Sequence, residues 1–189
     1  MSVIHFGSSP IIQHGYVVRD AEKAARAWSE RLGVGPFYLV EQTLDEYTYR
    51  NQPVENVTLR IAVSYWRDLQ IELLQPLTRE ATFYSQSLES APEKLNHYAI
   101  LVQDIDAVVR EHQLGKHVVH RGRLGAIGFT YLENYIPDGA ALELMQVDES
   151  TLQVFGALET LCRRWDRTRP VRSASELAAE LAQLGQPAS

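Results

Sequence analysis

The sequence has little cysteine, few basic residues and no long hydrophobic run, and each shortage excludes a class of protein. Cys162 is the single cysteine of 189 residues, which excludes an intramolecular disulfide and a cysteine-based zinc cluster. Lysine and arginine together number 18 against 24 aspartates and glutamates, whereas a nucleic-acid-binding surface is typically basic. The chain has no run of about 18 apolar residues, the length that a membrane-spanning helix needs. The N-terminal MSVIHFGSSP does not resemble a signal peptide. We therefore expect a cytoplasmic protein that binds neither nucleic acid nor membranes.

The remaining composition is that of an ordinary globular protein. Hydrophobic residues make up 45% of the chain and charged residues 22%, which argues against a disordered or fibrous protein. A chain of this length can bury about 70% of the surface that it exposes when unfolded. Folding by itself therefore requires neither a disulfide nor a metal ion.

The chain contains an internal repeat. The segment QHGYVVRD at 13–20 resembles NHYAILVQD at 96–104, because in each a polar residue and a histidine open an apolar run that ends at an aspartate. A second pair joins IELLQ at 71–75 with LELMQ at 142–146. The two halves keep the same order of motifs although their loops differ in length, which predicts two copies of one structural module.

Each half is predicted to fold as a strand, a helix and three strands. In the first half a strand at 11–18 leads to Asp20, which is placed to cap a helix that ends near Leu32 and Gly33. The other predicted strands are 37–43, 57–65 and 69–74, and in the second half 95–102, 117–121, 127–133 and 141–147, with a helix at 104–113. Further helices are predicted at 80–88, 150–165 and 175–184. The expected domains are a first βαβββ module at 10–76, a linker at 77–93, a second module at 94–148 and a helical extension at 149–189.

Four polar residues lie inside predicted strands, where polar side chains are costly to bury. They are His14, Glu72, His97 and Glu143, and they occupy corresponding strands of the repeat. Apolar residues flank each of them, so one face of the sheet is expected to pack on helices and the other to line a partly apolar cavity. A lone histidine or glutamate in a strand is more often a core or solvent-facing residue. Four in matching places instead favour a shared divalent metal ion, which would offset the cost of burying two carboxylates.

These residues carry a resemblance to a known family. Paired βαβββ modules with His14, Glu72, His97 and Glu143 resemble the vicinal oxygen chelate superfamily, which includes glyoxalase I, methylmalonyl-CoA epimerase, extradiol dioxygenases and bleomycin resistance proteins. The segments most similar to the epimerase-like glyoxalase branch are HGYVVRD (14–20), LGVGPF (32–37), IELLQP (71–76) and NHYA (96–99). The resemblance covers about residues 10–148. It implies an α+β fold in which two tandem modules form an eight-stranded, cup-shaped sheet, with the C-terminal helices as an addition.

The resemblance also implies a cofactor and a reaction. His14, Glu72, His97 and Glu143 would hold one divalent ion (Zn, Co, Mn, Ni or Fe), which a small substrate chelates through vicinal oxygens. The implied enzyme is a metal-dependent isomerase, epimerase or lyase that abstracts a proton next to a metal-chelated carbonyl, with Glu143 or Glu72 as the base. The chain departs from the epimerase at Leu59-Arg60, where that enzyme has a second carboxylate.

Two other functions stay open at this point. One is a non-catalytic protein of the same fold that holds a drug or another hydrophobic ligand in the cup. The other is an extradiol-type dioxygenase, which the presence of Glu72 disfavours because the oxygen-activating relatives resemble a set without that ligand. Tyr16, Tyr98 and Tyr131 are candidates for lining the cup, and the resemblance allows a homodimer.

Overall fold

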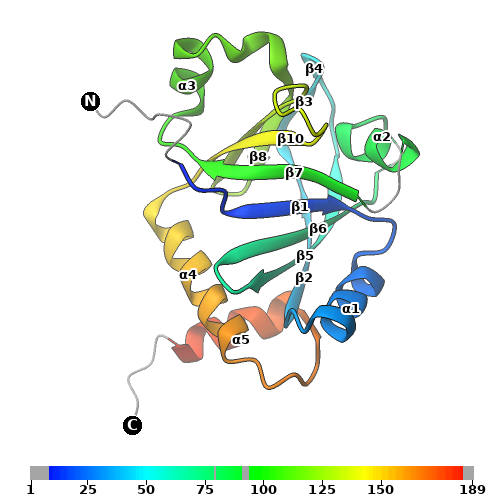
Figure 1. Ribbon diagram of the computed structural model, residues 1–189, viewed down its shortest axis with the longest axis vertical. Helices are drawn as coiled ribbons and strands as arrows, with labels where there is room; N and C mark the ends of the chain where they lie inside the picture. The colour runs from blue at the N-terminus through cyan, green and yellow to red at the C-terminus, as the bar shows by residue number, and fades with distance from the viewer. Residues whose placement is uncertain (1–8, 79, 91–93, 185–189) are drawn as a thin grey trace.

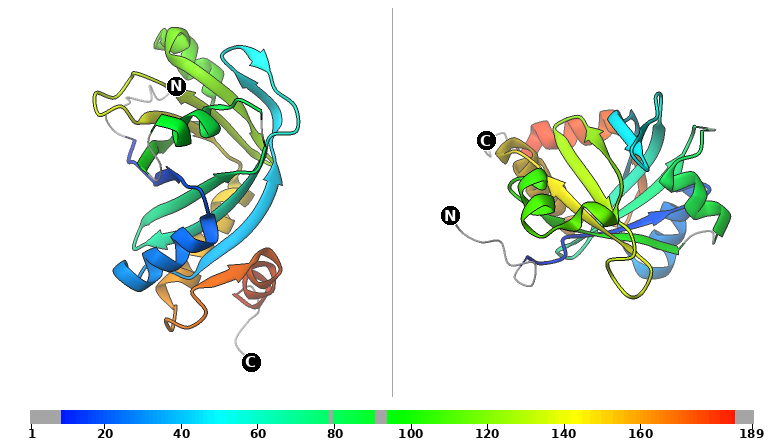
Figure 2. Two further views of the ribbon diagram at one scale, coloured as in Figure 1. Left: turned by 90° about the vertical axis from the view of Figure 1, so that its right-hand side faces the viewer. Right: turned by 90° about the horizontal axis from the view of Figure 1, so that it is seen from above.

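The computed structural model describes residues 9–78, 80–90 and 94–184. It is an α+β protein built on one large curved sheet with helices packed against it, which confirms the predicted fold class (Figure 1, Figure 2). Residues 1–8, 79, 91–93 and 185–189 lie outside the described part, and with them parts of the predicted linker and of the predicted helical extension. Among the helices of the described ranges, none has the length and hydropathy that a membrane span needs.

Two groups of strands with the same internal order meet at the middle of the sheet. The first group runs β2-β5-β6-β1 and the second runs β7-β10-β9-β8. Strands β1 and β7 pair antiparallel at the centre, whereas β1 with β6 and β7 with β10 are parallel pairs. The first group comprises β1 (Gln13–Val17), α1 (Ala21–Leu32), β2 (Phe37–Thr43), β5 (Thr58–Trp66) and β6 (Leu69–Pro76), and the second comprises β7 (Lys94–Leu101), α3 (Ile105–Glu111), β8 (Val118–Leu124), β9 (Ile127–Leu132) and β10 (Ala141–Gln146).

Three short strands extend the sheet beyond the eight that were predicted. They are β3 (Asp45–Tyr49) and β4 (Gln52–Pro53) at one edge and β11 (Val171–Ser173) at the other, giving eleven strands in the described residues. The β3–β4 turn contains Arg50 and Asn51, both with positive φ (50° and 62°). Such a turn is usually signalled by Asn-Gly or Asp-Gly, and neither is present here, so sequence patterning misses this hairpin.

The predicted helix signals are confirmed in both groups. Asp20 accepts a hydrogen bond from the Lys23 amide at the start of α1, and Asp104 accepts one from Ala107 at the start of α3. Gly33 ends α1 in the left-handed conformation (φ 67°). The remaining helices are α2 (Phe83–Ser90), α4 (Glu149–Arg163), α5 (Ala174–Leu184) and the short 3-10 helix at Leu114–His117.

Alternating side chains of the central strands separate a helix-covered face from a hollow one. On β6, Ile71 and Leu73 pack with α1 while Glu72 faces the cavity, and on β10, Leu142 and Leu144 pack beneath α3 while Glu143 faces the cavity. The strand period of two thus sends apolar residues to the helices and carboxylates into the cup. Figure 2 shows the curvature of the sheet that produces this hollow.

Candidate functional site

Four polar side chains, one from each of the four central strands, meet at the floor of the cup. They are Gln13 of β1, Glu72 of β6, His97 of β7 and Glu143 of β10. His97 is the common neighbour, because its Nε2 lies 3.1 Å from Gln13 Oε1, 3.1 Å from Glu143 Oε2 and 3.6 Å from Glu72 Oε2. Three of the four residues predicted as ligands are therefore brought together.

The structure does not bring His14 into this group, and Gln13 takes the place predicted for it. His14 stands opposite Tyr98 across the β1–β7 pair, on the other face of the sheet from His97, and the centroids of the two rings lie 5.1 Å apart in an edge-to-face arrangement. Side chains alternate along a strand, so a shift of one residue moves a side chain to the opposite face. The prediction that His14 joins the cluster is corrected on this ground.

Counting from the helix caps would have found Gln13. His97 lies seven residues before the capping Asp104, and the residue seven before the capping Asp20 is Gln13. His14 has the same residue type as His97 but lies six residues before Asp20, one position out of step with the repeat. Gln70 and Tyr84, which also line the cavity, carry no comparable repeat signal.

Gly15 makes room for the His97 ring. It lies directly opposite His97 across the β1–β7 pair, and a Cβ placed on it would stand 1.8 Å from His97 Cε1. His97 is fully buried, and Asn96, Gln13 and Tyr131 surround its ring. A glycine is required here for the imidazole to reach the floor of the cup.

A chain of hydrogen bonds orients the Gln13 amide and the His97 ring. Gln70 donates to Tyr65 Oη at 3.0 Å and accepts from Gln13 Nε2 at 2.6 Å, which turns Gln13 Oε1 toward His97. On the other side of the ring, His97 Nδ1 lies 3.2 Å from Asn96 Oδ1. Because that oxygen accepts only, we assign the ring proton to Nδ1, which leaves the Nε2 lone pair facing the carboxylates.

Burial perturbs the acidic groups around His97. Burial raises the pKa of Glu72 to about 7, an effect that His97 opposes and Glu143 reinforces. Tyr131 places its hydroxyl 3.4 Å from His97 Nε2, and Tyr84 lines the same cavity. Burial raises the pKa of both tyrosines well above the usual range, so both remain neutral phenols.

The buried oxygens of this cluster fit a cation. Glu143 Oε2 is buried without a hydrogen-bond partner in the described part of the chain. The assigned Nε2 lone pair faces three further electron-rich oxygens, an arrangement that costs free energy unless a proton or a cation lies among them. Ligands about 2.1 Å from a metal ion lie about 3.4 Å from each other in a tetrahedron, close to the spacings around His97. One imidazole and three oxygens suit a divalent first-row ion.

The cluster is not a preformed cage of titratable ligands. In the ranges described, no group of three or more His, Cys, Asp and Glu side chains has the arrangement of a metal-binding cluster. The fourth donor, Gln13, contributes an amide oxygen and is none of these residue types. A cation would therefore have to draw Glu72 inward, because its Oε2 lies 3.6 Å from His97 Nε2, farther than Gln13 Oε1 or Glu143 Oε2 at 3.1 Å.

The cluster opens into a cavity of about 180 Å³ with mainly apolar walls. Tyr131 lines it as predicted, whereas Tyr16 and Tyr98 do not. Arg60, near which the epimerase has a second carboxylate, also lies outside the lining and forms an ion pair with Glu41 at 2.5 Å. The cavity therefore contains the carboxylates of Glu72 and Glu143 and no further acidic side chain of the described residues.

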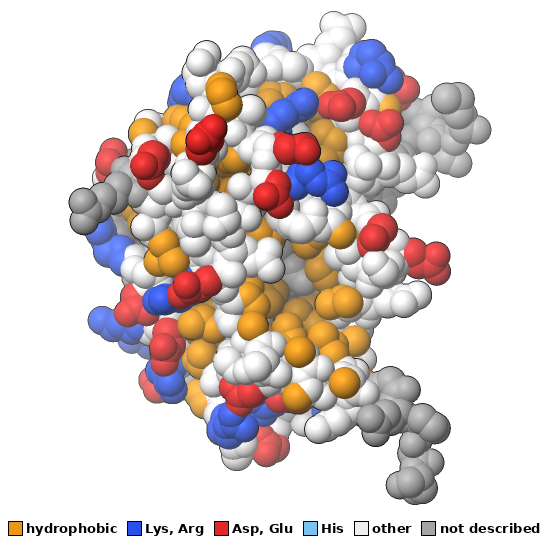
Figure 3. All heavy atoms as spheres, turned by 180° about the vertical axis from the view of Figure 1, so that it is seen from behind, with side chains coloured by type: hydrophobic (Ala, Val, Ile, Leu, Met, Phe, Trp, Pro, Cys, Tyr) orange, Lys and Arg blue, Asp and Glu red, His pale blue; other side chains and the backbone are white. Residues whose placement is uncertain are grey.

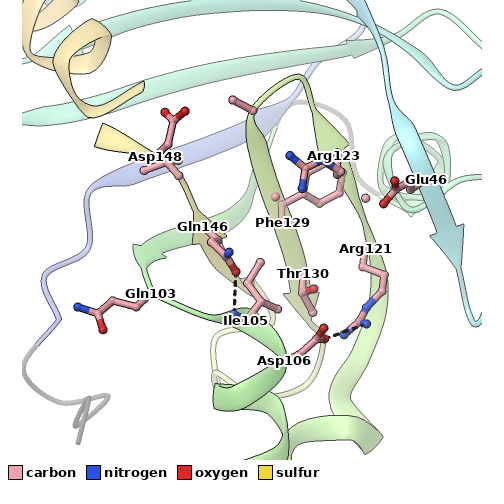
Figure 4. Close-up of a pocket in the computed structure, with 14 residues that line it drawn as sticks. Glu46, Gln103, Ile105, Asp106, Arg121, Arg123, Phe129, Thr130, Gln146 and Asp148 are labelled. Carbon is pink, nitrogen blue, oxygen red and sulfur yellow. Dashed lines mark hydrogen bonds and ion pairs between the residues drawn. The ribbon is translucent and has the colours of Figure 1, made fainter. Parts of the chain in front are cut away.

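A larger hollow, of about 530 Å³, lies on the other face of β9 (Figure 4). Gly128 and Thr130 face this hollow, while Ile127 and Tyr131 face the cavity of the cup. Its charged residues include Arg121, which is ion-paired with Asp106 at 3.2 Å. This hollow contains none of the clustered residues around His97, so the smaller cavity is the candidate functional site.

Several solved structures have a similar fold. Methylmalonyl-CoA epimerase from Mycobacterium tuberculosis is 19% identical, covers 79% of this chain and 97% of its own, and has a TM-score of 0.55. A variant of the Streptomyces coelicolor epimerase, in complex with 2-nitronate-propionyl-CoA, is 20% identical with coverages of 75% and 96% and a TM-score of 0.53. A hypothetical protein from Bacillus halodurans C-125 is 19% identical with the same coverages and a TM-score of 0.54.

The family assignment comes from the sequence match. Among curated proteins, none matches the chain significantly. Residues 12–132 match the family model described as the glyoxalase/bleomycin resistance protein/dioxygenase superfamily. This range contains the first three clustered residues, Gln13, Glu72 and His97, and it covers more than half of the chain. The protein belongs to the glyoxalase/bleomycin resistance protein/dioxygenase superfamily, as the resemblance predicted.

Proposed function

We propose that the protein is a metal-dependent isomerase, epimerase or lyase that abstracts a proton next to a carbonyl group of a small organic substrate with vicinal oxygens. The observation that supports this most is the meeting of one imidazole, two carboxylates and one amide oxygen at the floor of an apolar cavity. Membership of a superfamily that includes glyoxalases, and the fold shared with epimerases, support the same class of reaction.

Gln13, Glu72, His97 and Glu143 are the proposed ligands of one divalent ion, with Zn, Co, Mn, Ni and Fe as the candidate metals. When bound, the ion would act as a Lewis acid toward a carbonyl oxygen. The chain's own contribution is orientation. Gln70 directs the Gln13 oxygen, and Asn96 directs His97 Nε2. These hydrogen bonds hold the two ligand atoms in place, so they need not be reoriented at each turnover.

The proposed proton carriers are Glu72 and Glu143. Both carboxylates face the cavity, so either can reach a carbon atom of a substrate that lies there. Tyr84 and Tyr131 are neutral phenols beside them and can donate hydrogen bonds to an oxygen of the substrate. A substrate that fills the cavity would displace water from its apolar walls, which would strengthen these interactions.

A non-catalytic binding protein is the second candidate function, and the apolar walls of the cavity favour it. An extradiol-type dioxygenase is a weaker candidate, because Glu72 supplies a ligand that the oxygen-activating relatives lack. A homodimer stays a prediction from the resemblance, and a cytoplasmic location stays a prediction from the composition.

Solvent deuterium exchange separates the enzyme from the binding protein. We expect Mn²⁺-loaded protein in D₂O to exchange the hydrogen next to the carbonyl in at least one member of a panel of small aromatic hydroxyketones, as followed by proton NMR. Glu72→Gln and Glu143→Gln keep the side-chain shape but remove a base, so at least one should lower the exchange rate by at least about 100-fold.

Exposed Glu30→Gln is the matched control and should exchange at the wild-type rate. Oxygen-dependent ring cleavage by the Fe²⁺-loaded protein would assign the dioxygenase function instead. Tight binding of panel members with no exchange would assign the binding function.

A further inference from the structure

The candidate cavity has a polar floor and apolar walls. Gln13, Gln70, Glu72 and Glu143 lie at the floor, whereas most other lining residues are aliphatic or aromatic. None of the described residues that line the cavity is a lysine, an arginine or a histidine. An anionic group of a ligand would therefore lose its hydration here without gaining a cationic partner from the walls.

The C-terminal helices supply part of these walls. Val154, Phe155 and Leu158 of α4 and Leu177 of α5 line the cavity. Leu158 is 3% exposed and packs with Tyr38 and Cys162, which holds α4 against the sheet, whereas Val154 is 45% exposed. Figure 3 shows this side of the molecule with hydrophobic side chains gathered around a hollow.

These helices follow the segment that the family model covers. The match ends at residue 132, before α4 begins at Glu149. The similar epimerase structures are matched over 96–97% of their length yet cover only 75–79% of this chain. This chain is therefore longer than those relatives, and α4 and α5, which follow the segment that the family model covers, place residues at the cavity.

We propose that α4 and α5 select the substrate of this cavity: a molecule with an uncharged apolar body, about one aromatic ring in size, joined to the oxygens that reach the polar floor. This proposal rests on the proposed function for the role of the floor. The wall residues determine which apolar group of the substrate is accepted. It assigns Phe155 as a specificity-determining residue on α4.

The size of the body follows from the cavity volume. The cavity holds about 180 Å³, and a protein cavity of about 150 Å³ lined by aliphatic and aromatic residues binds benzene. One ring, or an aliphatic group of similar size, therefore fits beside the oxygens at the floor. A second ring or a nucleotide would have to remain outside the walls.

The charge of the body follows from the lining. Glu72 and Glu143 make the floor acidic, and the walls add no positive charge. A structural neighbour is described as an epimerase in complex with methylmalonyl-CoA, whose acyl group carries a carboxylate. In the present cavity a carboxylate on the apolar body would be disfavoured, so we expect a different substrate class.

Binding measurements test the walls with two pairs of probes. Benzohydroxamate and acetohydroxamate both offer two vicinal oxygens to Mn²⁺-loaded protein, and they differ only in the body. We expect benzohydroxamate to bind at least about ten-fold more tightly, because its ring enters the walls. Benzyl alcohol and 4-(hydroxymethyl)benzoate, measured by NMR on metal-free protein, test the charge, and the anion should bind at least about ten-fold more weakly.

Phe155→Ala should reduce the preference for benzohydroxamate by about ten-fold. Leu152 is an exposed apolar residue of α4 outside the lining, so Leu152→Ala should leave the preference unchanged.

Equal affinity of the two hydroxamates, or equal effects of the two variants, would overturn the proposal. So would a dimer that dissociates in Phe155→Ala, because the wall would then be a subunit interface. If Mn²⁺ does not strengthen hydroxamate binding but benzyl alcohol still binds and responds to Phe155→Ala, the walls are supported and the metal site fails.

Discussion

Gly15 shows how a residue without a side chain determines the position of a ligand. Its neighbour across the strand pair, His97, fills the space that a Cβ would need. The position of the His97 ring therefore depends on the glycine at 15, since the ring can reach the cluster only if β1 leaves room for it.

Gly15→Ala should destabilise the protein by about 1–3 kcal/mol, because the added methyl group would overpack the buried His97 ring. Urea unfolding measures this loss. Gly115→Ala is the control, since a Cβ there has no neighbour within 4 Å, and it should change stability little. Equal losses of stability in the two variants would contradict the claim that a side chain at position 15 clashes with His97.

Glu72 makes stability depend on pH. Burial raises its pKa from 4.5 to about 7, so between these values the folded chain holds a proton that the unfolded chain has lost. The contribution of Glu72 to the free energy of unfolding should therefore fall as pH rises from 4.5 to about 7, in protein kept metal-free with a chelator. The difference between wild type and Glu72→Gln, measured by urea unfolding across this range, isolates that contribution. A difference that stays constant would contradict the raised pKa.

Among the helices, α5 is held by polar contacts more than by buried area. None of its residues is buried. Glu180 accepts a hydrogen bond from the fully buried Tyr38 at 2.6 Å and pairs with Arg172 at 2.7 Å. Strand β11, which leads into α5, adds main-chain bonds to β2. Besides the packing of Leu177 against Tyr38 and Leu158, the position of α5 therefore depends on one carboxylate and one short strand.

Glu180→Ala should loosen α5 and cost about 1–3 kcal/mol, because the Tyr38 hydroxyl would be left buried without a partner. Hydrogen exchange of the amides of α5 is the most direct readout and should become faster. Glu22→Ala, which breaks an exposed pair with Arg26, is the matched control and should cost about 0.5 kcal/mol or less. Unchanged exchange in α5 would mean that other contacts hold it.

The elements that the sequence predicts well are those with long periodic patterns and clear caps. Asp20, Gly33 and Asp104 mark helix ends that the structure confirms, and the alternation around Glu72 and Glu143 correctly places apolar residues against helices. The β3–β4 hairpin escapes prediction because its strands are short and its Arg50-Asn51 turn lacks the usual sequence signal. Strand β11 escapes because it has three residues and pairs with β2, which is distant in sequence.

For the molecule as a whole, the candidate site could be predicted to within one residue. The repeat identifies the four strands, and three of the four side chains follow from it. Residue type points to His14 in place of Gln13, whereas the spacing of seven residues to the capping aspartates identifies Gln13. The pairing of β1 with β7 determines which of the two side chains faces the cavity. The contribution of α4 and α5 to the cavity likewise depends on tertiary packing that no local pattern signals.

The metal content of two variants at neighbouring positions, Gln13→Ala and His14→Ala, tests the central claim most directly. After loading with Mn²⁺ and desalting, wild-type protein and His14→Ala should each hold about one ion per chain, because His14 faces away from the cluster. Gln13→Ala should bind the ion at least about ten-fold more weakly, and His97→Ala should lose it, provided that circular dichroism shows both folded. Metal loss in His14→Ala with full retention in Gln13→Ala would contradict the account.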